Sequence, residues 1–208
     1  MMRRLLLLMV TLLTGVITLL ASPQAETDSV HATDPYEVSL EDNIATPEVP
    51  DRQKDAVRRH ILARAKELGV KKLNVETLRR GEVFAVVIPS DELFLPNDTL
   101  LRTDRATAKL RYFAPFFKTH GEYKVIIVVH SDDTGSEEYR YAMTDRRVQS
   151  LYEWFDANFT HTENLFGYGV GSDIPLKQND TAAGRRANRR VEIYVIPDEQ
   201  LLLQFRKK

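Results

Sequence analysis

The chain has 208 residues and a 43% hydrophobic fraction, enough for one globular domain with accessory segments. It contains no cysteine, which excludes disulfides, thiolate zinc sites, cysteine nucleophiles and a lipidated N-terminal cysteine. The net charge of −1 is unevenly placed, because residues 22–51 carry −8 and residues 52–208 carry +5; such a mildly basic body suits an anionic polymer, although an ordinary solvated surface would have the same charge.

The first 50 residues predict export followed by a linker. Arg3 and Arg4 precede an apolar run that extends to Ala21, and a cleavage site after Ala25 would complete a signal peptide at residues 1–25. The run is also near the minimum length of a membrane-spanning helix, so a retained anchor is the alternative, and only then would the protein contact a membrane. Residues 26–50 are acidic and aperiodic, which predicts a disordered linker.

An amphipathic helix is predicted over residues 51–71, since apolar residues recur there at helical spacing. These residues are Val57, Ile61, Ala65 and Leu68. The helix could pack on the domain or pair with a second copy. Residues 73–77 and 83–88, separated by a turn, predict a hairpin or two successive strands.

Residues 103–117 predict a core-facing helix that Pro115 kinks or shortens. Residues 125–129 form an uninterrupted apolar run rich in β-branched side chains, which is typical of a fully buried strand. The capping-box spacing of Thr134 and Glu137 predicts that a long helix begins there, and its pattern ends near Asn158.

A short strand at 165–170, a polar loop at 179–188, a closing strand at 189–196 and a basic tail at 198–208 complete the predicted elements. The order predicts an α/β fold of the α+β sandwich type. Two main helices pack on one face of a mixed sheet, and the helix at 51–71 precedes them.

Two charged residues next to the buried strand form the candidate site. Asp132 lies in the loop at the carboxyl end of the strand, where open α/β sheets bind ligands. Arg147 interrupts an apolar stripe of the following helix, and a buried guanidinium needs an anionic partner or an exit to water. Spacing alone leaves open a structural ion pair, a guanidinium that extends to solvent, or one anion and one cation at the mouth of a ligand pocket.

Four motifs together resemble the OmpA-like C-terminal domain family. They are Ser-Asp-x-x-Gly at 131–135, Met-Thr-Asp-Arg-Arg-Val at 143–148, Gly-x-Gly at 169–171 followed by Pro175, and Asn-Arg-Arg-Val-Glu at 188–192. The resemblance covers residues 72–197. It implies a noncatalytic peptidoglycan-binding module of the Gram-negative periplasm or cell envelope, without cofactor or metal. The implied partners are peptidoglycan and a possible second envelope protein, but no nucleic acid.

In that family an Asp and an Arg clamp the diaminopimelate of the peptidoglycan stem peptide, and Asp132 and Arg147 occupy the matching positions here. The resemblance gives supporting roles to five further residues, namely Ser131, Arg140, Thr144, Asn188 and Arg189. Of these, Arg189 could equally be a structural arginine that ties the last strand to the long helix. Arg140 replaces the family's neutral Asn, and it could donate to a ligand carboxylate or repel a ligand ammonium.

Two other classes of protein compete with this interpretation. An enzyme could use His130, Asp132 and Asp133 as a metal or acid–base cluster, but no second His has ligand spacing and no catalytic motif is present. A membrane-anchored stator-like or scaffold subunit would retain the leader and use the helix at 51–71 to dimerise, with the OmpA-like domain making protein contacts.

Overall fold

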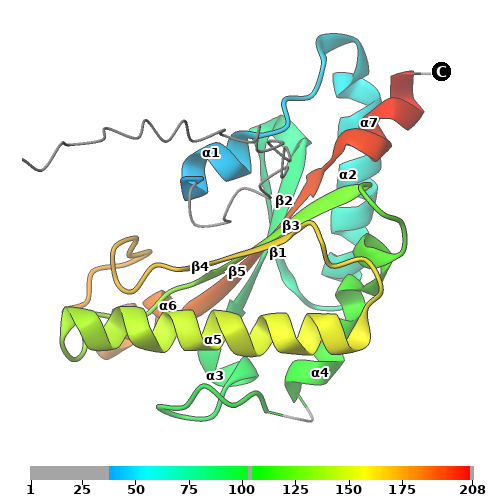
Figure 1. Ribbon diagram of the computed structural model, residues 1–208. Helices are drawn as coiled ribbons and strands as arrows, with labels where there is room; N and C mark the ends of the chain where they lie inside the picture. The colour runs from blue at the N-terminus through cyan, green and yellow to red at the C-terminus, as the bar shows by residue number, and fades with distance from the viewer. Residues whose placement is uncertain (1–37, 103–104, 207–208) are drawn as a thin grey trace, which may run out of the picture. The chain divides into compact units, whose positions relative to one another are not determined.

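The computed structural model describes residues 38–102 and 105–206 (Figure 1). The predicted signal peptide or anchor, the first part of the predicted linker and Thr103 lie outside these ranges. Within them, no helix combines the length and the apolar character needed to cross a bilayer.

A five-stranded mixed sheet forms the centre of the fold, in the order β1-β2-β5-β3-β4. The strands are β1 Asn74–Leu78, β2 Val83–Pro89, β3 Tyr123–Val129, β4 Leu165–Gly169 and β5 Arg190–Pro197. Only β3 and β4 pair in parallel, while the other neighbours are antiparallel, so β1 and β2 form the predicted hairpin. The mixed sheet with its helices confirms the predicted fold class.

Both faces of β3 are buried, which explains why its sequence does not alternate. Val125, Ile127 and Val129 belong to the main core beneath the helices, and Ile126 and Val128 belong to a smaller cluster on the opposite face. Successive strand residues point to opposite faces, so a strand covered on both sides is apolar throughout.

Helices cover the main face of the sheet. They are α2 Lys54–Val70, α4 Arg105–Leu110 with the 3-10 segment η3 Arg111–Phe117, α5 Glu137–Asn158 and α7 Glu199–Arg206. The buried residues of α2 are the four predicted from spacing, and α2 packs on β1 and β2 of its own domain. Three short elements connect the larger ones. They are the 3-10 turns at Asp51–Gln53 and Arg79–Gly81 and the one-turn helix α3 Ser90–Leu93.

Residues 38–50 are folded, which corrects the prediction that the linker extends to residue 50. Helix α1 Leu40–Ala45 lies on the second face of the sheet, where Leu40 and Ile44 pack against the smaller cluster. Lys124 of β3 donates to the carbonyl of Asn43 at 2.5 Å and to its Oδ1 at 2.8 Å, and burial lowers the pKa of Lys124 to about 8. These anchoring contacts come from residues about 80 positions away, so local composition gave no sign of them.

Two further predictions were wrong at the C-terminal end. The predicted polar loop contains the helix α6 Ala182–Asn188, which starts at an N-cap where Thr181 Oγ1 accepts from the Gly184 amide at 3.0 Å. The predicted basic tail forms α7, which buries Leu201 and Leu202 and packs beside α2. Helix α6 is short and has few apolar residues, so its periodic signal was weak.

Candidate functional site

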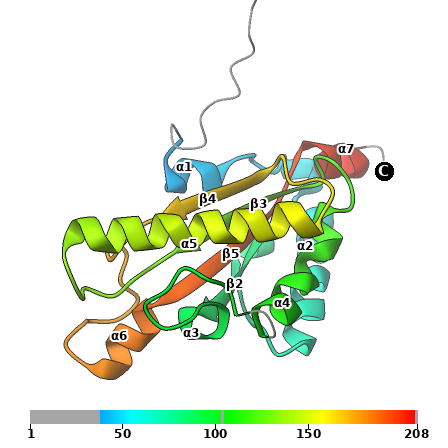
Figure 2. The same cartoon turned by 60° about the horizontal axis from the view of Figure 1, so that its bottom comes forward.

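A cavity of about 530 Å³ lies at the end of the sheet where β3 stops and α5 begins. Figure 2 shows α3, α6 and the first half of α5 gathered at this end. Its walls come from α3 and the loop after it, the β3–α5 loop, α5, and the residue before β5. The lining residues are Ser90, Asp91, Leu95, Pro96, Asn97, Ser131, Asp132, Thr134, Tyr139, Arg140, Met143, Arg147 and Arg189.

Asp132 is held rigidly in the β3–α5 loop and is only 5% exposed. Its Oδ1 accepts from the backbone N–H of Thr134 at 3.0 Å, and its Oδ2 forms an ion pair with Arg189. Burial alone would raise the pKa of Asp132, but the hydrogen bonds from Thr134 and the contact with Arg189 outweigh it and lower the pKa below its ordinary value. The carboxylate is therefore anionic at neutral pH.

The predicted start of the long helix was two residues early. Thr134 donates its amide to Asp132, and Ser136 is the N-cap, with its Oγ accepting from the Tyr139 amide at 3.2 Å. Gly135 has a φ of +86°, a conformation that disfavours residues with a side chain, and it turns the chain from the Asp132 loop into α5.

Arg147 lies on the buried side of α5 and is 7% exposed. Its Nε donates to the carbonyl oxygen of Asp98 at 3.0 Å, and its guanidinium carbon lies 4.9 Å from the ring centroid of Phe94. Among the described residues, no hydrogen-bond or ion-pair acceptor meets its two terminal nitrogens. Burial lowers the pKa of Arg147, yet a guanidinium remains charged at neutral pH.

The structural ion pair between Asp132 and Arg147 is not formed, since Asp132 pairs with Arg189 instead. Arg189 ends α6, and its side chain extends to the cavity from the side opposite α5. The charge of Arg189 is close enough to repel that of Arg147. Two guanidinium groups and one carboxylate, that of Asp132, therefore line this part of the cavity.

The structure brings five of the seven predicted site residues to the cavity and leaves two away from its lining. Thr144 is fully buried and ties α5 to the chain after β4, because its Oγ1 accepts from the amide of Gly171 at 3.2 Å. Asn188 is also fully buried, and it bonds to both backbone groups of Lys177 at 2.8 and 2.7 Å. Thr144 and Asn188 therefore hold together the segments around the cavity but do not line it.

Ser131 and Arg140 both stabilise the β3–α5 loop. The Ser131 hydroxyl donates to the carbonyl of Asp132 at 2.8 Å, and its amide donates to Gly171. Arg140 donates to the carbonyls of Gly135 at 2.6 Å and Asp133 at 3.4 Å. One nitrogen of the Arg140 guanidinium, Nη1, is thus engaged with the loop that carries Asp132, while its buried Nε meets no hydrogen-bond partner among the described residues.

Sequence reasoning missed the two contacts that orient Arg147. Phe94 lies under its guanidinium, and Asp98 contributes a main-chain carbonyl, which no residue-type pattern reveals. Phe94 belongs to the segment Phe94-Leu95-Pro96, which follows α3. Its role as a wall of the cavity depends on a contact across about 50 residues of chain.

The residues of the alternative enzyme cluster are not brought together. His130 is 2% exposed, and its Nε2 lies 3.6 Å from the carboxylate of Glu192 on the second face of the sheet. Asp132 faces the cavity with Arg189, and Asp133 is exposed. The three side chains have different environments, which does not fit a shared metal or acid–base centre.

Comparisons with known proteins were made for the whole chain. No protein-family model matches the chain. It is 27% identical over 113 residues to the peptidoglycan-associated lipoprotein of Legionella pneumophila, covering 54% of this chain and 64% of that protein. It is 32% identical over 72 residues to outer membrane protein A of Bordetella avium, covering 35% of this chain and 37% of that protein.

The structure is also similar to that of the cell wall anchor of the T6SS from Pseudomonas aeruginosa. The TM-score is 0.54 at 26% identity, and the match covers 67% of this chain and 96% of that chain. The chain spans less than two thirds of the length of the two curated relatives.

Proposed function

We propose that the OmpA-like domain of this chain binds peptidoglycan in the bacterial cell envelope, without catalysis, through the diaminopimelate of the stem peptide. The similarity to a peptidoglycan-associated lipoprotein and to a cell wall anchor supports binding to the wall. The choice of diaminopimelate rests on the family resemblance of the site motifs and on the charges that line the cavity.

The observation that carries the proposal is the state of Arg147. It is a buried cation with one hydrogen bond to the protein, and its guanidinium lines a cavity whose wall also contains a buried anion, Asp132. A buried charge without sufficient partners is costly to a fold. A ligand carboxylate would supply the missing acceptors for both terminal nitrogens at once.

Diaminopimelate has the matching chemistry. Its free end presents an ammonium and a carboxylate on one carbon. The guanidinium of Arg147 can bind the carboxylate through two parallel hydrogen bonds, and Asp132 can accept from the ammonium. Thr134 and Arg189 hold the Asp132 carboxylate in place before the ligand arrives, which reduces the entropy lost on binding.

The test is retention of the purified protein on sacculi that contain diaminopimelate. The wild type should sediment with the sacculi, whereas Asp132→Ala and Arg147→Ala should each remain largely in solution. Asp133→Ala and Arg146→Ala are matched controls, because each removes an exposed charge next to a site residue. Circular dichroism establishes that the variants are folded.

If the two site variants sedimented with the sacculi as fully as the wild type and the two controls, the assignment of the site would be refuted. Loss of binding in the two controls as well would point to a general charge effect instead of a clamp.

A further inference from the structure

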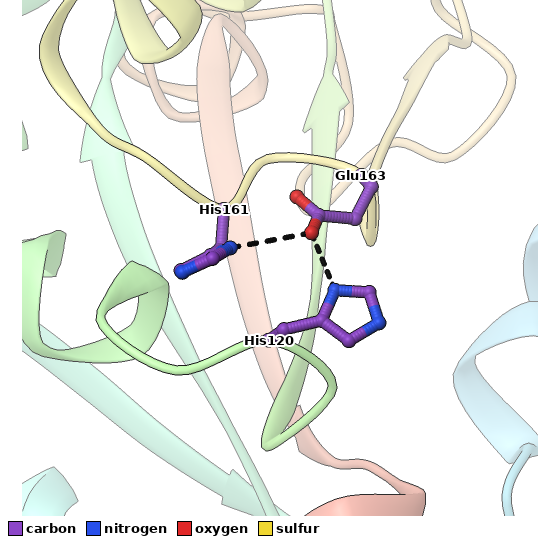
Figure 3. A group of neighbouring side chains, drawn as sticks. All are labelled: His120, His161 and Glu163. Carbon is purple, nitrogen blue, oxygen red and sulfur yellow. Dashed lines mark hydrogen bonds and ion pairs between the residues drawn. The ribbon is translucent and has the colours of Figure 1, made fainter.

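A second group of polar side chains lies at the other end of β3, away from the cavity. His120 lies in the turn before β3, and His161 and Glu163 lie in the loop between α5 and β4. Figure 3 shows both imidazole rings directed toward the carboxylate of Glu163. Chain positions 120 and 161 are too far apart for a ligand motif, so the sequence gave no indication of the group.

We propose that His120, His161 and Glu163 form a binding site for a zinc ion. One possible ligand atom from each residue lies within 4.8 Å of the others. Two neutral imidazoles and one carboxylate are a ligand set that Zn²⁺ takes in proteins, with a water molecule in the fourth position.

The geometry is close to that of a bound state. The Oε1 atom of Glu163 accepts from Nδ1 of His120 and lies 3.3 Å from Nδ1 of His161. Ligand atoms about 2.1 Å from a tetrahedral zinc ion are roughly 3.4 Å from one another. The three side chains are 63%, 37% and 45% exposed, so they can make the small rotations needed without disturbing the core.

The backbone that carries these ligands is fixed by hydrogen bonds. The amide of Leu165 donates to Thr162 at 3.0 Å, and the amide of Val125 donates to Asn164 at 3.0 Å. The turn at His120 is held by the Gln200 amide, which donates to the Gly121 carbonyl at 3.0 Å. A site on fixed loops loses little conformational entropy when the ion binds.

The alternative is an ordinary surface ion pair. Such a pair contributes little to stability and needs only one histidine. The convergence of two histidines from separate loops on a single carboxylate oxygen is what distinguishes this group.

Isothermal titration of the full-length chain with zinc chloride, without a polyhistidine tag, tests the proposal. We expect one zinc ion per chain. The variants His120→Ala, His161→Ala and Glu163→Gln should each weaken zinc binding at least about tenfold. Loss of a residue that only supports a metal ligand already weakens metal binding by about this factor. Magnesium should not bind, because it prefers oxygen ligands in an octahedral shell.

Matched controls are His31→Ala, which removes an imidazole outside the described residues, and Glu153→Gln, which removes an exposed carboxylate of α5. Both should bind zinc like the wild type.

The proposal would be overturned if the wild type showed no saturable zinc binding. It would also be overturned if all three site variants bound zinc as tightly as the wild type. Arg147→Ala should retain full zinc binding, so failure at one site is distinguishable from failure at the other.

Discussion

Arg147 and Arg190 are both buried arginines, yet their hydrogen bonding differs. Arg190 is 4% exposed, and all three of its nitrogens have acceptors: Glu192 at 2.6 Å, the Asn188 carbonyl at 3.4 Å and the Ile174 carbonyl at 3.2 Å. Arg147 is 7% exposed and has one acceptor, the Asp98 carbonyl. The fold supplies hydrogen-bond acceptors to every guanidinium nitrogen of Arg190, whereas it supplies only one acceptor to Arg147.

The difference supports the proposal that Arg147 binds a ligand, whereas Arg190 has a structural role. The bonds of Arg190 join the start of β5 to the loop after β4, so its charge is used within the fold. The single bond of Arg147 fixes the direction of its guanidinium and leaves the terminal nitrogens for an external acceptor. Loss of Arg190 should therefore change stability, and loss of Arg147 should change binding.

Arg190→Met should have the largest effect. It leaves Glu192, which is 14% exposed, without its closest cationic partner, and breaking a buried ion pair costs several kcal/mol. We expect the free energy of unfolding at pH 7 to fall by about 2–4 kcal/mol, measured by urea denaturation. Binding of a diaminopimelate-containing stem peptide by the folded variant should stay within about twofold of wild type, since Arg190 does not line the cavity.

The pH dependence provides the control for this prediction. Burial would raise the pKa of Glu192, but His130, Tyr194 and Arg190 together lower it to about 2. A lowered carboxyl pKa stabilises the fold above its unfolded value of about 4.5, and the stabilisation is lost as the pH falls toward 2. The gap between wild type and Arg190→Met should therefore narrow below pH 4.5, and a constant gap would contradict the assigned ion pair.

Arg147→Lys should have an intermediate effect, confined to binding. Lysine keeps the charge but cannot form two parallel bonds to a carboxylate. We expect the Kd for a diaminopimelate stem peptide to rise about tenfold, or about 1.4 kcal/mol, in isothermal titration. The unfolding free energy should change by less than about 1 kcal/mol.

A stem peptide with lysine in place of diaminopimelate is the matched ligand. It keeps the ammonium and lacks the neighbouring carboxylate, so wild type and Arg147→Lys should bind it equally weakly. An equal loss on both peptides would show that Arg147 does not recognise the carboxylate.

The sequence predicted the elements with strong local patterns. The run at 125–129, the spacing of Val57, Ile61, Ala65 and Leu68, and the end of α5 at Asn158 all agree with the structure. Helix α1 was missed because its stability comes from Lys124 and from the second face of the sheet, which are distant in sequence. Local composition cannot predict a helix whose stability depends on contacts with residues far away in the sequence.

For the site, the sequence placed Asp132 and Arg147 near each other but did not identify their partners. Motif matching could not distinguish Asn188 and Thr144, which support the site from within the fold, from Arg189, which enters the cavity. The contacts of Arg147 with Phe94 and the Asp98 carbonyl involve a ring face and a main-chain oxygen. Neither leaves a pattern of residue types.

Arg140→Asn should have the smallest effect, and it tests whether an arginine of the cavity that donates to the β3–α5 loop also recognises the ligand. The sequence left two roles for Arg140, a donor to the ligand carboxylate or a source of repulsion for its ammonium. The structure shows instead that Arg140 donates to the Gly135 and Asp133 carbonyls at 2.6 and 3.4 Å. We therefore expect the Kd for the diaminopimelate peptide to change by less than about threefold, or about 0.6 kcal/mol.

The three roles of Arg140 predict different outcomes for this variant. A direct donor would cause a loss of about tenfold, and a repelling charge would cause a comparable gain, since each would alter one charge-assisted contact. A loop-stabilising role predicts nearly unchanged affinity with faster hydrogen exchange of the amides in residues 133–136, because Asn is too short to bond both carbonyls. Arg146→Asn, on the exposed side of α5, should change neither quantity. A tenfold change in either direction would mean that hydrogen bonding within the protein does not separate structural from ligand-binding arginines in this cavity.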